Sequence, residues 1–136
     1  MKPRNLLIFA MTLVVIGSLS CKKEDSKPTY QIAGLWEGTY LYLSQPPLYF
    51  SFTIYPDGSL SYKSKGINDY TFYANGNWSL NGTTFTYNVT TTNNPGGTQA
   101  NQTGTATYHN DGRLTDGENT DVTFGGTGTF SMTRVN

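Results

Sequence analysis

Apolar and polar residues alternate with a period of two along most of the chain after residue 30. Between residues 33 and 43, Trp36, Tyr40 and Tyr42 fall on one face with Gly38, and the leucines fall on the other. Such alternation predicts a half-buried β-strand, with one row of side chains on a core and the other in solvent. No helical periodicity is present, and the frequent Thr, Tyr and Phe also favour strands.

Turn signals separate the predicted strands. Pro56-Asp57-Gly58-Ser59 combines a proline that presets φ with a glycine that accepts positive φ. Asn81-Gly82 is a strong hairpin signal, typical of the central pair of a type I′ turn. The expected strands are 33–43, 49–55, 60–63, 70–74, 77–80, 84–90 and 103–109, then a short irregular return from 114, a strand at 122–124 and a last one at 127–135.

About eight or nine short strands without a helix predict an all-β domain over residues 30–136, built as an antiparallel up-and-down meander. Closing the meander into a small barrel would remove its exposed edges. A two-sheet β-sandwich is the alternative architecture. The segment holds 107 residues, enough for one domain with a single modest core.

The N-terminal segment 1–20 has the order of an export signal. Lys2 and Arg4 precede an apolar run from Leu6 to Ile16, and small residues follow up to Cys21. The run has about 11 residues, whereas a membrane-crossing helix needs roughly 20, so a cleaved signal peptide is favoured over a permanent anchor.

Cys21 is the one cysteine of the sequence, and a polar tether (21–29) follows it. The segment around it resembles a lipobox, although Ser18 stands where leucine is usual. The resemblance implies diacylglycerol on the Cys21 sulfur, further acylation by a chain such as palmitate, and membrane attachment through lipid. A free thiol or an intermolecular disulfide is the alternative.

Lys23, Glu24 and Asp25 follow the cysteine directly. This run resembles the export tag of surface lipoproteins in Bacteroidetes, which implies the outer membrane and its outer face. A solvated linker without a signal is the alternative.

Charge excludes one class of partner. Without residues 1–20, seven Lys and Arg face nine Asp and Glu, a net charge of −2. The basic residues beyond the tether are too few and too scattered for a groove that follows phosphates. We therefore expect no nucleic-acid partner.

No residue pattern specifies a reaction. His109 is the one histidine, and it has no cysteine to join it in a zinc site of the usual three or four ligands. No serine has a recognisable base beside it. Residues 116–121 include several side chains whose oxygen atoms could bind calcium, but their spacing is not that of an EF-hand. We expect no enzyme, no cofactor and no metal.

Three local patterns carry a resemblance to a known family. Gly34-Leu35-Trp36 resembles the Gly-x-Trp of lipocalins, and Arg134 stands where that superfamily has an arginine packed over the tryptophan. Residues 52–59 and 76–83 resemble repeated features of the small lipocalin-like lipoproteins of Bacteroidetes. The resemblance implies a barrel whose first and last strands are joined through Gly34, Trp36 and Arg134. A guanidinium stacked on an indole contributes about 0.5 to 2 kcal/mol.

Aromatic residues carry the remaining functional signal: ten Tyr, seven Phe and two Trp. Tyr40, Tyr42, Tyr62 and Tyr87 fall on faces assigned to the interior, where they are expected to line a pocket for a small hydrophobic or amphipathic ligand. Alternatively, these rings only fill the barrel. In that case exposed aromatic residues such as Tyr73 contact glycan or an envelope protein. Tyr49 and Tyr55 also fall on outward strand faces. We expect a monomer.

Overall fold

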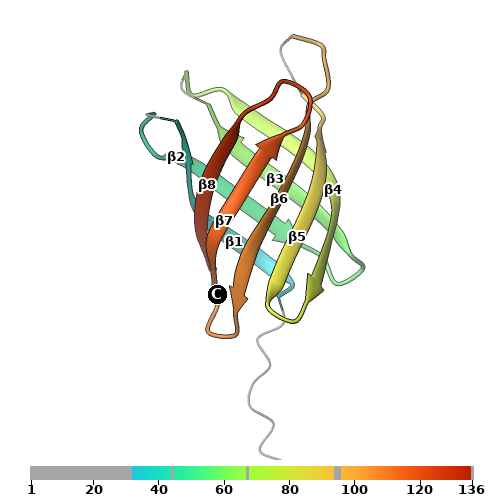
Figure 1. Cartoon of the computed structure of the whole chain (residues 1–136). Coiled ribbons are helices and arrows are strands. Elements are labelled where there is room, and N and C mark those ends of the chain that lie inside the picture. The colour runs from blue at the N-terminus through green and yellow to red at the C-terminus, as the bar shows by residue number, and fades with distance from the viewer. Residues whose placement is uncertain (1–31, 44, 67, 94–95, 136) are drawn as a thin grey trace, which may run out of the picture.

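The computed structural model describes residues 32–135 apart from 44, 67, 94 and 95 (Figure 1). The export signal, Cys21, Lys23, Glu24 and Asp25 lie outside the described residues. Within the described part the chain forms eight strands and no helix, so none there is long and apolar enough to cross a membrane. The strands are β1 (Gly34–Tyr42), β2 (Leu48–Ile54), β3 (Ser59–Lys65), β4 (Thr71–Asn81), β5 (Thr84–Thr91), β6 (Asn101–His109), β7 (Arg113–Asp121) and β8 (Thr127–Arg134).

The strands form an antiparallel meander that closes on itself. Each strand pairs with the next, and β8 returns to pair with β1, so the sheet is a closed barrel (Figure 1). The predicted fold class is therefore confirmed, and the sandwich alternative is wrong. Closure satisfies backbone groups that would be unpaired at the two edges of an open sheet.

Two predicted strands, 70–74 and 77–80, are one continuous strand, β4. Gly76 does not interrupt it, since it is paired with Leu60 on one side and with Val89 on the other. The predicted strand at 122–124 is wrong, because those residues form the turn between β7 and β8. Asp121 Oδ1 accepts hydrogen bonds from the backbone N–H groups of Thr123 and Phe124, both at 2.9 Å, which fixes that turn.

Strand β7 is longer than the irregular return that the sequence suggested. Its register with β8 shifts between Leu114 and Gly117, and Asp116 has φ of 52°. One extra residue at such a bulge is absorbed without ending the strand.

The hairpin at Asn81-Gly82 is confirmed, but its centre is one residue later than expected. Asn81 pairs with Thr84, which leaves Gly82 and Thr83 as the central residues. Gly82 has φ of 60°, while neither Asn81 nor Thr83 has positive φ. Positive φ at the first central position alone is the geometry of a type II′ turn, not type I′.

The barrel core is aromatic and solid through most of its length. Trp36, Phe50, Phe52 and Phe85 have no exposed surface. The rings of Phe50 and Phe52 meet edge to face with centroids 4.8 Å apart, and Phe52 meets Tyr87 in the same way at 4.9 Å. Edge-to-face pairs of this kind each contribute about 0.5 to 1.5 kcal/mol beyond burial.

Two glycines let the barrel turn corners. A Cβ on Gly38 would overlap the Ser131 carbonyl oxygen of β8, and a Cβ on Gly76 would overlap the Asn88 carbonyl oxygen of β5. In both places the obstacle is neighbouring backbone, which cannot move aside as a side chain can. Glycines at sharp bends of this kind are how sheets close into small barrels.

Gly34, Trp36 and Arg134 come together where β1 meets β8. Trp36 is paired with Arg134 in the ladder, and its Nε1 donates a hydrogen bond to the Ile32 carbonyl at 2.7 Å. Arg134 Nη2 donates to the Ala33 carbonyl at 3.0 Å, and a Cβ on Gly34 would stand 3.0 Å from this guanidinium. The arginine thus joins the two strands through the backbone around Gly34, while the Trp36 indole meets the Tyr108 ring edge at 6.1 Å.

Candidate ligand-binding site

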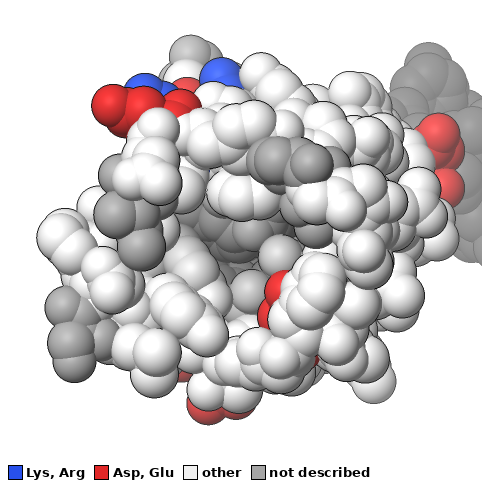
Figure 2. Space-filling view, turned by 90° about the horizontal axis from the view of Figure 1, so that it is seen from above, with Lys and Arg blue, Asp and Glu red and all other residues white. Residues whose placement is uncertain are grey.

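The two ends of the barrel differ. Both described ends of the chain lie at one end, with the turns after β2, β4 and β6 (Figure 1). The turns after β1, β3, β5 and β7 lie at the other. Figure 2 looks down on this second end and shows a hollow inside the ring of strands. We call it the open end, because the solid aromatic core lies below it.

A cavity of about 320 Å³ occupies the open end. Aromatic side chains from four different segments form much of its wall: Tyr40, Tyr42, Tyr62, Phe72 and Phe124. Tyr40 and Tyr42 are stacked, with ring centroids 6.3 Å apart and an interplanar angle of 24°. Three of the four tyrosines predicted for a pocket therefore line this one.

Tyr87, the fourth predicted tyrosine, is buried beneath the cavity and joins its polar lining. Its hydroxyl donates a hydrogen bond to Asn119 Oδ1 at 2.6 Å. Asn119 Nδ2 in turn points to Gln102 Oε1 at 3.5 Å, and both of these amides line the cavity. The interior thus changes from a mainly aromatic and apolar core to a hydrogen-bonding lining at the open end.

Burial keeps the interior phenols protonated. Removal from water raises the pKa of Tyr62, although hydrogen bonds with Ser64 and Gln102 oppose this effect. Burial also raises the pKa of Tyr87 well above its usual value. The pKa of Tyr40 is raised by burial as well, against the effect of a hydrogen bond with Asn119. A protonated phenol both donates and accepts hydrogen bonds, so these hydroxyls can serve a bound molecule in either role.

Glycines on neighbouring strands make room for these rings. A Cβ on Gly104 would stand 2.6 Å from Cζ of Tyr87, and a Cβ on Gly128 would stand 2.5 Å from Cζ of Tyr40. An aromatic ring placed over a glycine of the next strand is a recurring packing device in sheets. The ring positions are therefore set by β6 and β8 as well as by the strands that carry the tyrosines.

The sequence pattern did not identify the polar lining. Asn119 and Asp121 were assigned to an acidic loop, yet they point into the barrel from β7, where Gly117 also faces inward. The period-two alternation that located the tyrosines would have found them, had β7 been recognised as a regular strand. Ser64 and Gln102 share inward faces with Tyr62 and Ala106 and could have been identified in the same way.

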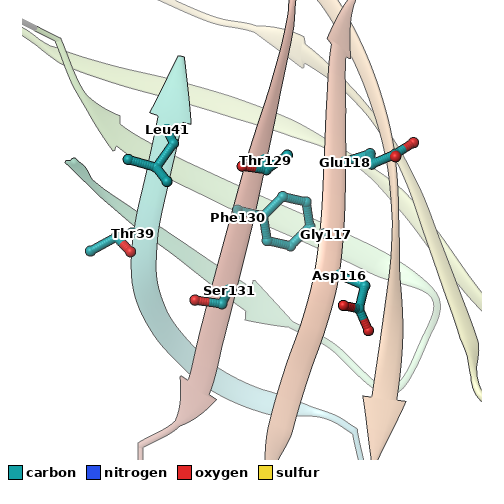
Figure 3. A pocket seen from close by; sticks show the side chains of 8 residues that line it. All are labelled: Thr39, Leu41, Asp116, Gly117, Glu118, Thr129, Phe130 and Ser131. Carbon is teal, nitrogen blue, oxygen red and sulfur yellow. The ribbon is translucent and has the colours of Figure 1, made fainter. Parts of the chain in front are cut away.

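A second hollow lies on the outer wall, where β1, β8 and β7 run side by side (Figure 3). It encloses about 440 Å³ and is larger than the interior cavity, but it is an open groove between neighbouring strands on the outer wall. Its acids, Asp116 and Glu118, point in different directions in Figure 3, and Asp116 Oδ2 accepts a hydrogen bond from Thr115. We therefore place the candidate site in the barrel, where the strands surround the space and polar groups converge.

The segment 116–121, which the sequence suggested as an acidic loop, is part of a strand. It belongs to β7, on which Glu118 is exposed while Asn119 and Asp121 face the interior. Among the described residues, no three His, Cys, Asp or Glu side chains gather as a metal site would require. His109 Nε2 lies 2.8 Å from Thr115 Oγ1, in a side-chain hydrogen bond.

The outward tyrosines Tyr49, Tyr55 and Tyr73 are spread over both ends of the barrel. The Tyr49 hydroxyl donates to Glu37 Oε1 at 2.9 Å, and Lys63 Nζ lies 5.7 Å from the centre of its ring. Tyr55 and Tyr73 are 43% and 48% exposed. Tyr55 follows the end of β2 at the closed end, whereas Tyr73 lies near the start of β4 at the open end.

Comparison with models of known protein families, with curated proteins and with solved structures finds no match to this chain.

Proposed function

We propose that this protein binds a small hydrophobic or amphipathic molecule in the open end of its barrel, without catalysis. The observation that carries the proposal is the cavity of about 320 Å³ above a solid core, walled by tyrosines and edged by Asn119 and Gln102. Apolar walls with a few converging polar groups are the usual composition of a small-molecule site.

The size of the cavity limits the ligand. Small-molecule pockets usually enclose about 300 to 1,000 Å³, so this one is at the lower end of the range. A compact ligand with one ring or a short chain fits such a space, and a long acyl chain does not, because Phe50 and Phe52 fill the barrel below. The carrier function is therefore proposed for small molecules.

We further propose that lipid on Cys21 anchors the protein to the outer membrane, on the outer face. The described chain begins at Ile32, at the closed end of the barrel (Figure 1). A tether attached there would leave the open end directed away from the membrane. The ligand would then come from the surrounding medium.

A larger side chain placed in the cavity is expected to exclude the ligand. The chain, purified gently from the cells that make it, is expected to show a small-molecule adduct in native mass spectrometry that leaves on denaturation. Leu48 lines the cavity, and Leu48→Trp should reduce the adduct at least about tenfold, equivalent to about 1.4 kcal/mol, because an indole occupies the space.

Leu41→Trp is the matched control. Leu41 lies on the paired strand β1 but is 44% exposed on the outer wall, so the adduct should remain. A clean mass for the unmodified chain would contradict the carrier function and favour contacts with glycan or protein through exposed aromatics such as Tyr73.

The anchor has its own test. Cys21→Ala should release the protein from the membrane fraction into the soluble fraction, because each buried methylene of a lipid contributes about 0.8 kcal/mol to membrane binding. Immunoblots of the two fractions measure the change. Ser20→Ala is the control: it keeps the Cys21 sulfur and a small residue before it, so this variant should stay with the membranes. Continued sedimentation of Cys21→Ala would show that lipidation does not hold the protein there.

A further inference from the structure

The charged groups at the open end give the cavity a negative bias. Two charged residues, Asp121 and Lys65, line the cavity among the described residues. Lys65 Nζ lies 3.9 Å from Asp69 Oδ1 in an exposed ion pair on the rim. With Lys65 offset by Asp69, Asp121 is left as the uncompensated charge.

Asp121 is placed to act on the interior of the cavity. It is paired with Gln102 across β6 and β7, and its charge contributes to the raised pKa of both Tyr40 and Tyr62. Its Oδ1 is used by the turn, where it accepts the N–H groups of Thr123 and Phe124. A carboxylate has further acceptor positions on both oxygens, which remain for a ligand.

The aromatic wall of the cavity also favours a positively charged ligand. Tyr40, Tyr42, Tyr62, Phe72 and Phe124 surround the space into which Asp121 faces. The faces of aromatic rings attract cations, and rings grouped around a cavity are a common site for organic ammonium groups. Among the described residues no arginine lines the cavity, so a carboxylate or phosphate ligand would lack a partner there that could hold it in a bidentate geometry.

We infer that the cavity selects a small organic amine, with an apolar or aromatic body against the tyrosines and its ammonium group toward Asp121. The inference rests on the proposed binding function and adds the charge of the ligand. Anions are disfavoured because they would be desolvated beside Asp121, while Lys65, the cation that lines the cavity, is in an ion pair with Asp69.

Three probes with similar bodies and different heads test the inference: phenethylamine, phenethyl alcohol and phenylpropionate. The protein purified from its host is titrated with each probe by calorimetry. We expect the Kd of phenethylamine to be at least about tenfold lower than that of phenylpropionate, with the Kd of phenethyl alcohol between them. An equal or lower Kd for phenylpropionate would overturn the inference, as would the absence of amine binding.

Asp121→Asn identifies the group responsible. The asparagine keeps an oxygen that can accept the N–H groups of the turn, so the fold should be retained while the charge is lost. The advantage of the amine over the alcohol should disappear, and the Kd of the alcohol should stay within about twofold. Glu118→Gln, which removes the same charge from the outer face of β7, should leave the advantage intact. An amine preference that survives Asp121→Asn would overturn the inference.

The carrier function is judged separately by the adduct in native mass spectrometry. An adduct that proves to be a carboxylic acid would leave the carrier function standing and overturn the preference for amines. An amine adduct would support both.

Discussion

Gly38→Ala and Gly76→Ala are each expected to destabilise the barrel by at least about 3 kcal/mol, the upper end of the usual range for overpacking. The added methyl group at residue 38 would overlap the Ser131 carbonyl oxygen and stand 2.7 Å from Met132 Cα. At residue 76 it would overlap the Asn88 carbonyl oxygen and stand 2.7 Å from Val89 Cα. Relief would require two paired strands to separate, which breaks ladder hydrogen bonds.

Such a loss is large, because a domain of this size has a total stability of about 5 to 15 kcal/mol. Urea unfolding followed by circular dichroism measures it, and we expect a much lower midpoint or no folded baseline. Gly82→Ala is the control: its Cβ would meet nothing within 4 Å, so the cost there is the positive φ alone, about 1 to 3 kcal/mol. If Gly38→Ala and Gly76→Ala cost no more than Gly82→Ala, the two glycines are not required for barrel closure.

Trp36→Ala is expected to lower the free energy of unfolding by about 3 to 5 kcal/mol, as for other buried large aromatic residues. The indole has no exposed surface, packs edge to face on Tyr108, and donates to the Ile32 carbonyl. Truncation would leave a cavity at the closed end and remove the partner of that carbonyl. The same urea titration gives the value.

Trp78→Ala provides the comparison, since it removes the same side chain from a partly exposed site on β4. The Trp78 indole donates to the Tyr55 carbonyl at 2.9 Å, so some loss is expected, but less than for Trp36 because less apolar surface is buried. Equal losses at the two positions would mean that Trp36 has no special part in closing the barrel.

The amino-acid sequence located the interior of the barrel well. Period-two alternation placed Trp36, Tyr40, Tyr62 and Tyr87 on inward faces, and the structure confirms all four. Alternation works here because each antiparallel strand has one face on the core and one in solvent. The proline–glycine turn at 56–59 was also correct, since Asp57 Oδ1 accepts from Ser59 N and from Ser59 Oγ.

The errors arose where local composition and tertiary pairing disagreed. Apolar Val122 and Phe124 suggested a strand, but they lie in a turn and are 60% and 61% exposed. The polar run 116–121 suggested a loop, but it is paired with both β6 and β8. Local patterns report what a segment prefers by itself, whereas a strand also forms where two neighbours supply hydrogen-bond partners.

By itself the sequence determined the class of fold and the inward tyrosines, because both depend on residues close together in the chain. The tertiary structure decided which glycines form the corners of the barrel, since the obstacle at Gly38 is the backbone of β8, more than ninety residues away in sequence. It also decided the lining of the cavity, where Tyr87, Gln102 and Asn119 meet from three strands. Alternation can place each of these residues on an inward face, but which of them meet depends on the register between strands and not on spacing within one strand.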